Sequence, residues 1–263
     1  MARPAQPGIV VVGSVNMDVV SAVAAFPQPG ETVTASATTF HPGGKGANQA
    51  VAAAAAGASV DFIGALGDDA FAEPLAAGLA AHGVGVAALA RKPTTSGQAF
   101  ITVNAAGQNT IILSAGANGQ VTAAEVEAQR PCIAQASALL TKREIPWGAT
   151  LAALRLAHEA GARSIHNPAP AAPLPGAAWP LIETLILNET EAATLTGQPV
   201  ASLADASLAA LALLGRGVRV VIVTLGALGS LYLDAAGRHI ETPIFPVAIV
   251  DTTGAGDTFI GMY

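Results

Sequence analysis

Apolar runs of strand length alternate with helix-length segments along most of the chain, and this order limits the fold more than any other feature of the sequence. Residues 9–15 (IVVVGSV) and 60–65 predict buried strands because they are rich in apolar and β-branched residues. Further strands are expected at 137–141, 163–167, 184–187, 218–223, 230–234 and 238–241, and helices at 44–57, 68–82, 149–160, 189–196 and 203–215. Such alternation implies βαβ units, so we expect an α/β fold with a mostly parallel central sheet.

A second group of segments has the pattern of a small antiparallel sheet. Residues 32–40 (TVTASATTF) alternate in polarity and are rich in threonine, as in a half-exposed strand. Residues 98–103 and 110–113 alternate on either side of the turn sequence AAGQN, which is typical of a hairpin. We expect these three strands to lie together, apart from the main sheet.

Composition excludes several classes of function. A net charge of −6, without a basic cluster, argues against a nucleic-acid partner. No uncharged apolar run reaches the ~18 residues that a membrane span requires. The five histidines lie far apart, without the spacing of zinc ligands. Cys132 is the only cysteine, which excludes an internal disulfide and favours a reducing compartment. We therefore expect a soluble cytoplasmic protein.

The sequence Gly254-Ala255-Gly256-Asp257 predicts a site of phosphoryl transfer to an alcohol. Small residues let the backbone close on an anion, and unpaired N–H groups at a helix start bind phosphate. A carboxylate in the same turn can take the proton of the attacking hydroxyl. The chain has no GxGxxG pattern, and Gly44-Lys45 is followed by Gly46 instead of Ser or Thr. Any phosphate site must therefore use the 254–257 turn.

Polar residues also follow several predicted strands. Lys45 and Asn48 stand among three glycines before a helix, a pattern of either close backbone approach to a ligand or a flexible turn. Asn16 and Asp18 follow the first strand, where open α/β sheets bind ligands and where turn-forming residues are also common. Glu144 follows the strand at 137–141 and could equally be a surface residue.

Two further segments have both a structural and a functional interpretation. Asn188 and Glu191 have the spacing of a capping box, and Glu191 could also lie near a phosphate-bound Mg²⁺. Residues 224–229 (TLGALG) form either a hairpin turn or the floor of a site for ATP.

Taken in order, these segments resemble the ribokinase family of carbohydrate kinases (the phosphofructokinase-B type). The resemblance covers nearly the whole chain. Its most specific parts are GGKGANQAVA (43–52) and VDTTGAGDTF (250–259), and it also includes GSVNMD (13–18), ILSAGAN (112–118), NPAP (167–170), LNETE (187–191) and VTLGALG (223–229).

The resemblance implies an ATP-dependent kinase that phosphorylates the 5-hydroxyl of D-ribose, with Asp257 as general base. The turn of Gly254, Ala255, Gly256 and Asp257 would form the anion hole. The ribose would be held by Asn16, Asp18, Gly44, Lys45, Asn48 and Glu144. ATP would face Asn188, Thr224, Gly226 and Gly229, with Mg²⁺ reached by Glu191 through water and K⁺ by Asp251 and Thr253.

The resemblance also implies a domain organisation. Residues 1–263 would form one kinase domain, a three-layer sandwich, with segments 14–42 and 95–113 making a β lid that covers the sugar and joins two subunits in a homodimer. Family members continue beyond the position of Tyr263, so we expect a complete sugar half and an incomplete nucleotide half. Two alternatives remain: a sister kinase that acts on another sugar or a nucleoside, and a truncated, non-catalytic sugar-binding protein.

Overall fold

The centre of the fold is a nine-stranded sheet. The computed structural model describes residues 8–248 and 252–263 of the chain. Its strand order is β13-β12-β11-β10-β9-β8-β1-β4-β5. Seven strands are mutually parallel: β1 (Ile9–Val12), β4 (Val60–Leu66), β5 (Val84–Arg91), β8 (Ala138–Thr141), β9 (Arg163–His166), β10 (Thr184–Asn188) and β11 (Val220–Thr224). β12 (Ser230–Asp234) and β13 (His239–Thr242) add an antiparallel edge.

Helices cover both faces of this sheet. On one face lie α1 (Lys45–Ala55), α2 (Ala72–Ala81) and α8 (Ala255–Met262). On the other lie α3 (Ala123–Ala128), α4 (Arg130–Gln135), α5 (Trp147–Ala160), α6 (Glu189–Thr196) and α7 (Leu203–Leu214). Short 3₁₀ turns occupy Gly116–Gln120, Gly176–Leu181 and Gly226–Leu228.

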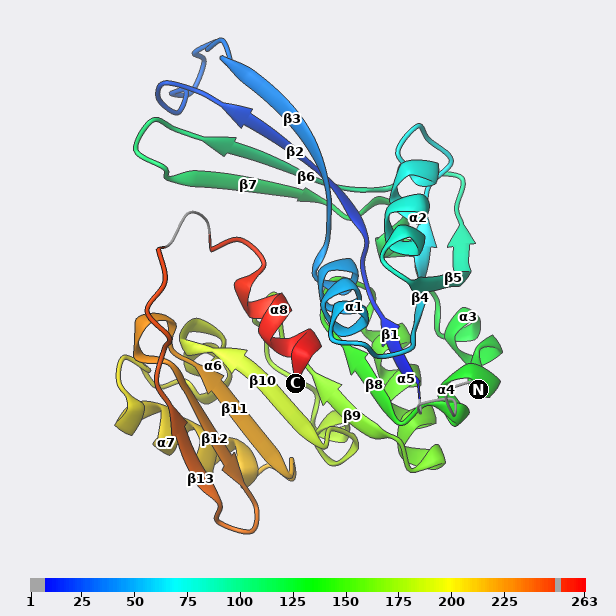
Figure 1. The fold of residues 1–263 in the computed structure, drawn as a ribbon, viewed down its shortest axis with the longest axis vertical. Helices are drawn as coiled ribbons and strands as arrows, with labels where there is room; N and C mark the ends of the chain where they lie inside the picture. The colour runs from blue at the N-terminus through cyan, green and yellow to red at the C-terminus, as the bar shows by residue number, and fades with distance from the viewer. Residues whose placement is uncertain (1–7, 249–251) are drawn as a thin grey trace.

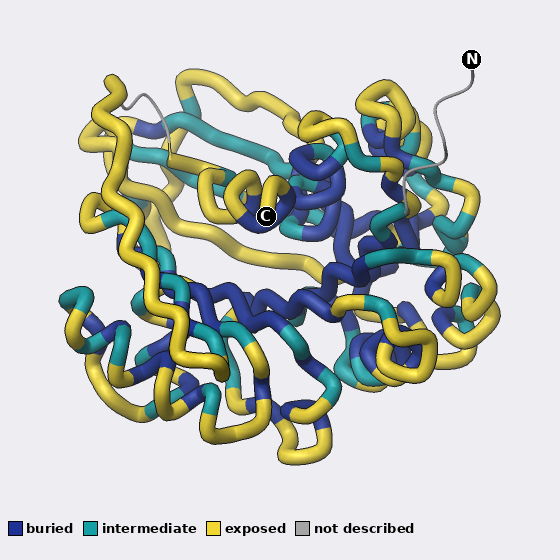
Figure 2. The backbone as a smooth tube through the Cα atoms, turned by 60° about the horizontal axis from the view of Figure 1, so that its bottom comes forward, coloured by how far each residue is buried: buried dark blue, intermediate teal, exposed yellow. Residues whose placement is uncertain are grey.

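The two faces explain why the central strands are apolar without alternation. Val11 packs in the cluster beneath α1 and α2, whereas Val10 and Val12 pack in the cluster on the opposite face. Full burial of such a side chain stabilises the fold by roughly 1.5–3 kcal/mol. Figure 2 shows the strands of the main sheet as a buried band across the molecule. The predicted α/β, three-layer architecture is confirmed.

A four-stranded sheet of order β3-β2-β6-β7 lies apart from the main sheet. It consists of β2 (Asn16–Ala22), β3 (Ala37–Gly43), β6 (Gly97–Val103) and β7 (Asn109–Ser114). β3 and β7 pair with their neighbours antiparallel, while β2 and β6 pair parallel. In Figure 1 this sheet lies above α1 and α8, and β3 leads directly into α1.

The boundaries of several elements differ from the sequence prediction. The strand expected at 32–40 begins at Ala37 and continues to Gly43, because it pairs residue by residue with β2 from Asn16↔Gly43 to Ala22↔Ala37. The helix expected from residue 68 begins at Ala72. Asp69 instead accepts hydrogen bonds from the backbone N–H and the hydroxyl of Ser96, at 2.7 and 2.8 Å.

Within residues 8–248 and 252–263, none of the helices combines the length and the apolar character needed to cross a membrane.

Candidate active site

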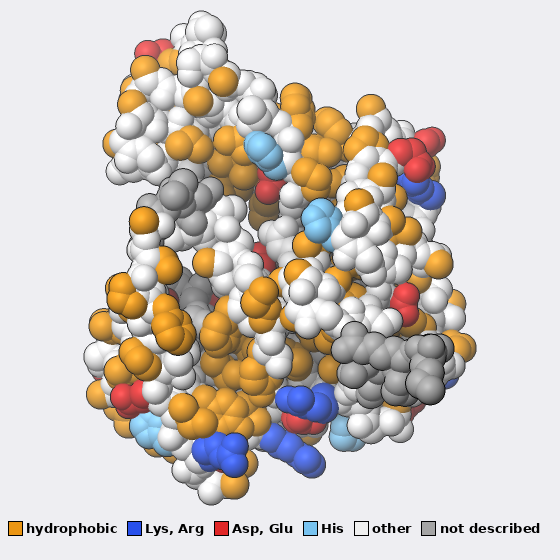
Figure 3. All heavy atoms as spheres, in the orientation of Figure 1, with side chains coloured by type: hydrophobic (Ala, Val, Ile, Leu, Met, Phe, Trp, Pro, Cys, Tyr) orange, Lys and Arg blue, Asp and Glu red, His pale blue; other side chains and the backbone are white. Residues whose placement is uncertain are grey.

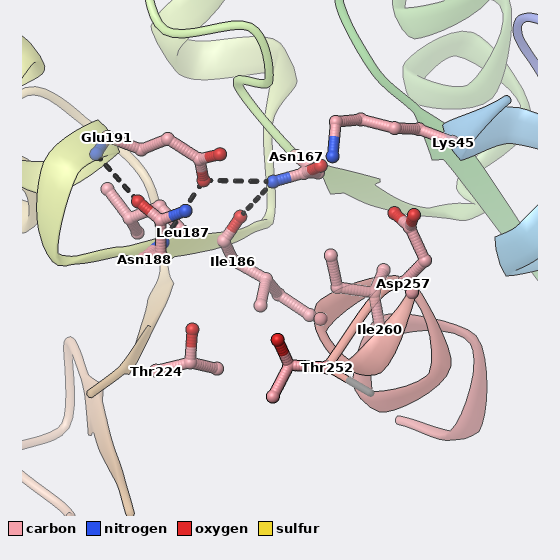
Figure 4. Close-up of a pocket in the computed structure, with 12 residues that line it drawn as sticks. Lys45, Asn167, Ile186, Leu187, Asn188, Glu191, Thr224, Thr252, Asp257 and Ile260 are labelled. Atoms are coloured by element: carbon pink, nitrogen blue, oxygen red, sulfur yellow. Dashed lines mark hydrogen bonds between the residues drawn. The ribbon is translucent and has the colours of Figure 1, made fainter. Parts of the chain in front are cut away.

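A cavity of about 210 Å³ opens at the carboxyl ends of the parallel strands, beside the start of α8. Its lining comes from α1, the residue after β9, the ends of β10 and β11, α6, and α8 with the segment before it: Lys45, Asn167, Ile186, Leu187, Asn188, Glu191, Thr224, Thr252, Gly254, Gly256, Asp257 and Ile260. Figure 4 shows Lys45, Asn167, Glu191 and Asp257 around one opening. The fold therefore brings together predicted sugar, nucleotide and catalytic residues that are up to 212 positions apart in sequence.

The 254–257 turn forms the start of α8, as its sequence predicted. Gly254 is the N-cap with φ of 75°, a left-handed conformation that favours glycine. The first N–H groups of a helix have no partner within it and bind anions, and Gly254, Gly256 and Asp257 of this turn line the cavity. The N–H of Ala255 donates to the carbonyl of Thr252 at 3.1 Å, so this amide is engaged in the turn itself.

Asp257 lies in the first turn of α8 with only 6% of its surface exposed. Its Oδ2 accepts a hydrogen bond from Asn48 Nδ2 at 3.3 Å, and its Oδ1 accepts one from Gln49 Nε2 at 2.9 Å. Both donors come from α1, which packs directly against α8. A carboxylate held in this way has a fixed orientation and faces the cavity that it lines.

Glu144 joins the loop after β8 to the start of α1. Its Oε2 accepts the backbone N–H of Lys45 at 3.0 Å and also the hydroxyl of Ser14. The Ser14 hydroxyl in turn accepts the N–H of Gly46 at 3.3 Å. Glu144 is therefore partly buried and bonded to the backbone at the start of α1, outside the lining of the cavity.

Asp18 is half-buried on β2 and lies close enough to Glu144 for the two charges to repel each other. Burial and, to a smaller extent, repulsion from Glu144 raise the pKa of Asp18 to about 6, while His41 acts in the opposite direction. A Cβ on Gly43 would overlap the Asp18 carboxylate, so any other residue at this position of β3 would displace that side chain.

Asn16 is buried at the start of β2. Its Oδ1 accepts a hydrogen bond from Asn118 Nδ2 at 2.7 Å, and Asn118 also bonds both backbone groups of Val15. A Cβ on Gly97 would overlap these two amide groups. Gly44 is the N-cap of α1 with φ of 91° and approaches the backbone of Asn16. Asn16 and Gly44 are thus neighbours, outside the lining of the cavity.

Glu191 has the first of its two expected roles, in the capping box, and its role toward Mg²⁺ stays a prediction. The capping box with Asn188 is present, with Glu191 N donating to Asn188 Oδ1 at 2.8 Å and Asn188 N donating to Glu191 Oε2 at 3.0 Å. Asn167 Nδ2 donates to the same Oε2 at 3.2 Å. Burial raises the pKa of Glu191, while the Asn188 amide and the charge of Lys45 act in the opposite direction.

The remaining predicted residues are less closely grouped. Thr224 ends β11 and lines the cavity, whereas Gly226 and Gly229 lie in the following turn. Gly229 has φ of 91°, and a Cβ there would overlap the carbonyl of Thr242 on the edge hairpin. Thr253 lies in the turn before α8, and Asp251 falls outside the described residues.

Several buried polar residues of the site were assigned no role from the sequence, although all but Lys142 lie inside motifs of the family resemblance. They are Ser14, Gln49, Asn118, Lys142 and Asn167, and all are shielded from solvent. Gln49 could have been found from its spacing, because it stands four residues after Lys45 and hence on the same side of α1. Lys142, two residues before Glu144, has no comparable signal, since lysine is almost never fully buried.

Comparisons with known proteins agree with this geometry. The profile of the pfkB family of carbohydrate kinases matches residues 6–263. The ribokinase of Schizosaccharomyces pombe is 41% identical over 265 residues, covering 97% of this chain and 83% of that protein. The bifunctional ribokinase/ribose-5-phosphate isomerase A of Fructilactobacillus sanfranciscensis is 41% identical over 255 residues, and the chain spans 47% of its length.

The structure of Arabidopsis thaliana ribokinase complexed with ribose and ATP superposes with a TM-score of 0.91 at 33% identity, covering 97% of this chain and 84% of that one. The family profile, the relatives and the fold thus lead to the same conclusion. The chain belongs to the pfkB family of carbohydrate kinases, as its sequence predicted.

Proposed function

We propose that this protein is an ATP-dependent ribokinase that converts D-ribose and ATP to D-ribose 5-phosphate and ADP. The observation that carries the proposal is Asp257: a buried carboxylate in the first turn of a helix, oriented by two α1 side chains and facing a cavity lined by Lys45 and Glu191. Similarity to ribokinases, including one solved with ribose and ATP, supports the choice of substrates.

The chemistry follows from this placement. Asp257 accepts the proton of the sugar's 5-hydroxyl while the oxygen forms its bond to the γ-phosphorus and the bond to the β-phosphate oxygen breaks, releasing ADP. A positioned base of this kind contributes typically ~10²–10⁴ in rate. The amides of Gly256 and Asp257, at the positive end of α8, stabilise the transferring phosphate. The amide of Ala255 joins them when its bond to Thr252 opens.

The polar wall around Asp18 and Glu144 favours a sugar over a nucleoside. Two carboxylates, the amides of Asn16 and Asn48, and Lys45 offer many hydrogen-bond partners for adjacent hydroxyls. The four-stranded sheet, with segments 14–42 and 95–113, acts as the lid over that sugar. A sister kinase for another sugar remains the second candidate function, because the same groups bind other arrangements of hydroxyls.

The residues present fit a nucleotide with Mg²⁺. Glu191 is a buried acid that lines the cavity, and both of the bonds drawn to its carboxylate in Figure 4 use Oε2. Its Oε1 can therefore accept a hydrogen bond from water on Mg²⁺, which usually keeps several waters. A cation near Glu191 would also offset the free-energy cost of burying the negative charge of its carboxylate. Asn188 and Thr224 face the same cavity and would contact ATP, with Gly226 and Gly229 in the adjoining turn.

Three further features belong to the proposal. K⁺ beside the anion hole, held through Asp251 and Thr253, rests on the sequence resemblance. Dimerisation through the lid is supported by exposed apolar side chains on its strands, among them Phe40, Phe100 and Ile112, the last 70% exposed. Figure 3 shows apolar side chains on this lobe and a hollow below it that contains acidic groups. The single cysteine supports a cytoplasmic location.

The test is to incubate the purified protein with ATP, Mg²⁺ and, in turn, ribose, deoxyribose, fructose and adenosine, and to identify the product by ³¹P and ¹³C NMR. The proposal expects phosphate on the 5-oxygen of ribose, with ribose as the best acceptor by kcat/KM. A higher kcat/KM for another acceptor would indicate a sister kinase that acts on that acceptor. Ribose binding by calorimetry without any turnover would support a non-catalytic sugar-binding protein.

A further inference from the structure

A fully buried lysine lies behind the site. Lys142 directly follows β8, has 0% of its surface exposed and is among the largest fully buried side chains of the described residues. Its methylene chain passes over Gly13 at the end of β1, where a Cβ would overlap Lys142 Cε. A glycine at the end of the neighbouring strand thus makes room for the lysine.

The ammonium group of Lys142 points toward Gln49. Lys142 Nζ donates to Gln49 Oε1 at 3.5 Å, and the Gln49 side chain is completely buried as well. The charges that act on Lys142 are those of Asp257 and Glu144, which favour its protonated form, and that of Lys45, which opposes it. Burial is the larger effect and lowers the pKa of Lys142 to about 7.

The lysine fixes the direction of the Gln49 amide. Because the protonated amine of Lys142 only donates hydrogen bonds, it favours the rotamer in which Gln49 Oε1 faces Lys142, and the neutral amine keeps N–H donors for the same contact. The amide nitrogen must then point the other way, where Nε2 donates to Asp257 Oδ1 at 2.9 Å and to Asn167 Oδ1 at 3.4 Å. Reversal of the amide would place two oxygens against each other at Asp257.

This arrangement distinguishes the two oxygens of Asp257. Oδ1 is bound to Gln49, a residue without access to solvent, whereas Oδ2 is bound to Asn48, a predicted sugar ligand. A sugar hydroxyl that displaces Asn48 therefore meets Oδ2, while Oδ1 remains held from behind.

We propose that Gln49 and Lys142 are positioning residues for the catalytic base: Lys142 fixes the Gln49 amide, and Gln49 holds Asp257 Oδ1 so that Oδ2 faces the sugar hydroxyl. The inference rests on the proposed role of Asp257. It adds to that role a second layer of residues, none of which contacts the sugar or the nucleotide.

The experiment compares Gln49→Met and Lys142→Met, which keep side-chain length, with Lys142→Gln, which keeps a donor toward Gln49. Gln49→Met should lower kcat by about 10²-fold, the cost of a misplaced reacting group, with the KM for ribose nearly unchanged. Without its donor, the ionised carboxylate is also less favoured, so the acid limb of the kcat–pH profile should move to higher pH. Lys142→Met should lower kcat, and Lys142→Gln should restore most of it.

Thr184→Val provides the matched control, because Thr184 is equally buried on β10 and its hydroxyl finds no partner among the described residues. It should leave kcat and the pH profile unchanged. The double variant Gln49→Met/Asp257→Asn should be no slower than Asp257→Asn, since Gln49 and Lys142 affect turnover only by positioning Asp257.

Two results would overturn the positioning role while leaving Asp257 as the base. One is a wild-type kcat in folded Gln49→Met. The other is an unchanged pH profile of Gln49→Met together with a double variant in which the two losses of kcat add. Undiminished turnover of Asp257→Asn would instead refute the proposed function itself. If Gln49→Met does not fold, the comparison of Lys142→Met with Lys142→Gln tests the proposal. Equal kcat values of these two variants would overturn the positioning role.

Discussion

Replacing Lys142 with methionine should change how the stability of the protein depends on pH. The pKa of this lysine falls from its ordinary value of 10.5 to about 7 in the folded chain, mainly because of burial. Below pH 7 both the folded and the unfolded chain carry the proton, so the cost of the buried charge is fully present. Between pH 7 and 10.5 the unfolded chain binds a proton that the folded chain has released, so the free energy of unfolding rises with pH.

The size of the effect follows from these two pKa values. Each pH unit inside the window contributes about 1.4 kcal/mol, and the full range amounts to about 5 kcal/mol. Between pH 7 and pH 9, where the transition at pH 7 is only half complete at the start, the wild type should gain about 2 kcal/mol relative to Lys142→Met. The variant should therefore be the more stable protein at pH 6, and its advantage should shrink as the pH rises.

Urea denaturation followed by tryptophan fluorescence at pH 6, 7, 8 and 9 measures this difference, and comparing two proteins at each pH removes the titration of all other groups. Lys92→Met is the control, because Lys92 is only partly buried and pairs with Glu125 at 2.6 Å. Its difference from wild type should be constant over the same range. Parallel stability curves for wild type and Lys142→Met would refute the reasoning, since they would mean that no buried ammonium titrates.

Two further predictions concern the sugar pocket. Gly43→Ala should displace the Asp18 carboxylate and weaken ribose binding in calorimetry about 10–100-fold, the worth of one charged hydrogen bond. Gly148→Ala, where a Cβ meets nothing within 4 Å, is the matched control, and equal affinities of the two variants would contradict the assignment of Asp18. Because the pKa of Asp18 is raised to about 6 and the ionised form is the better acceptor, ribose affinity should rise about tenfold from pH 5 to pH 7. Asp18→Asn should remove that dependence, and a slope that survives in this variant would assign it to another group.

Much of the fold could be predicted from the sequence because local patterns and tertiary structure agree. The helix at 189–196 and the strand at 230–234 have the predicted bounds. The first is fixed by a capping box that involves residues three apart, and the second by an apolar alternation of its own. The turn before Asp257 was equally predictable, since a left-handed glycine and a helix N-terminus are local properties.

Features that depend on distant partners could not be predicted in this way. β3 begins at Ala37 because β2 selects its register, and Asp69 leaves the helix because Ser96 offers it two donors. Lys142 gives no sign in the sequence that it is buried, because its place depends on Gly13 and Gln49 from other elements. Sequence reasoning therefore named the residues expected to bind ligands and missed the buried residues that support them, even where these lie in the same motifs, as Gln49 does.

The most direct test of the account is to measure ribose binding and turnover side by side in wild type and Asp257→Asn. Asparagine keeps the shape of the side chain and can keep one of its two hydrogen bonds with α1, because only one of its terminal atoms is an acceptor, and it cannot accept the hydroxyl proton. We predict unchanged ribose affinity in calorimetry and a kcat lowered by at least about 10²–10⁴-fold. A folded Asp257→Asn protein that phosphorylates ribose at the wild-type rate would contradict the account.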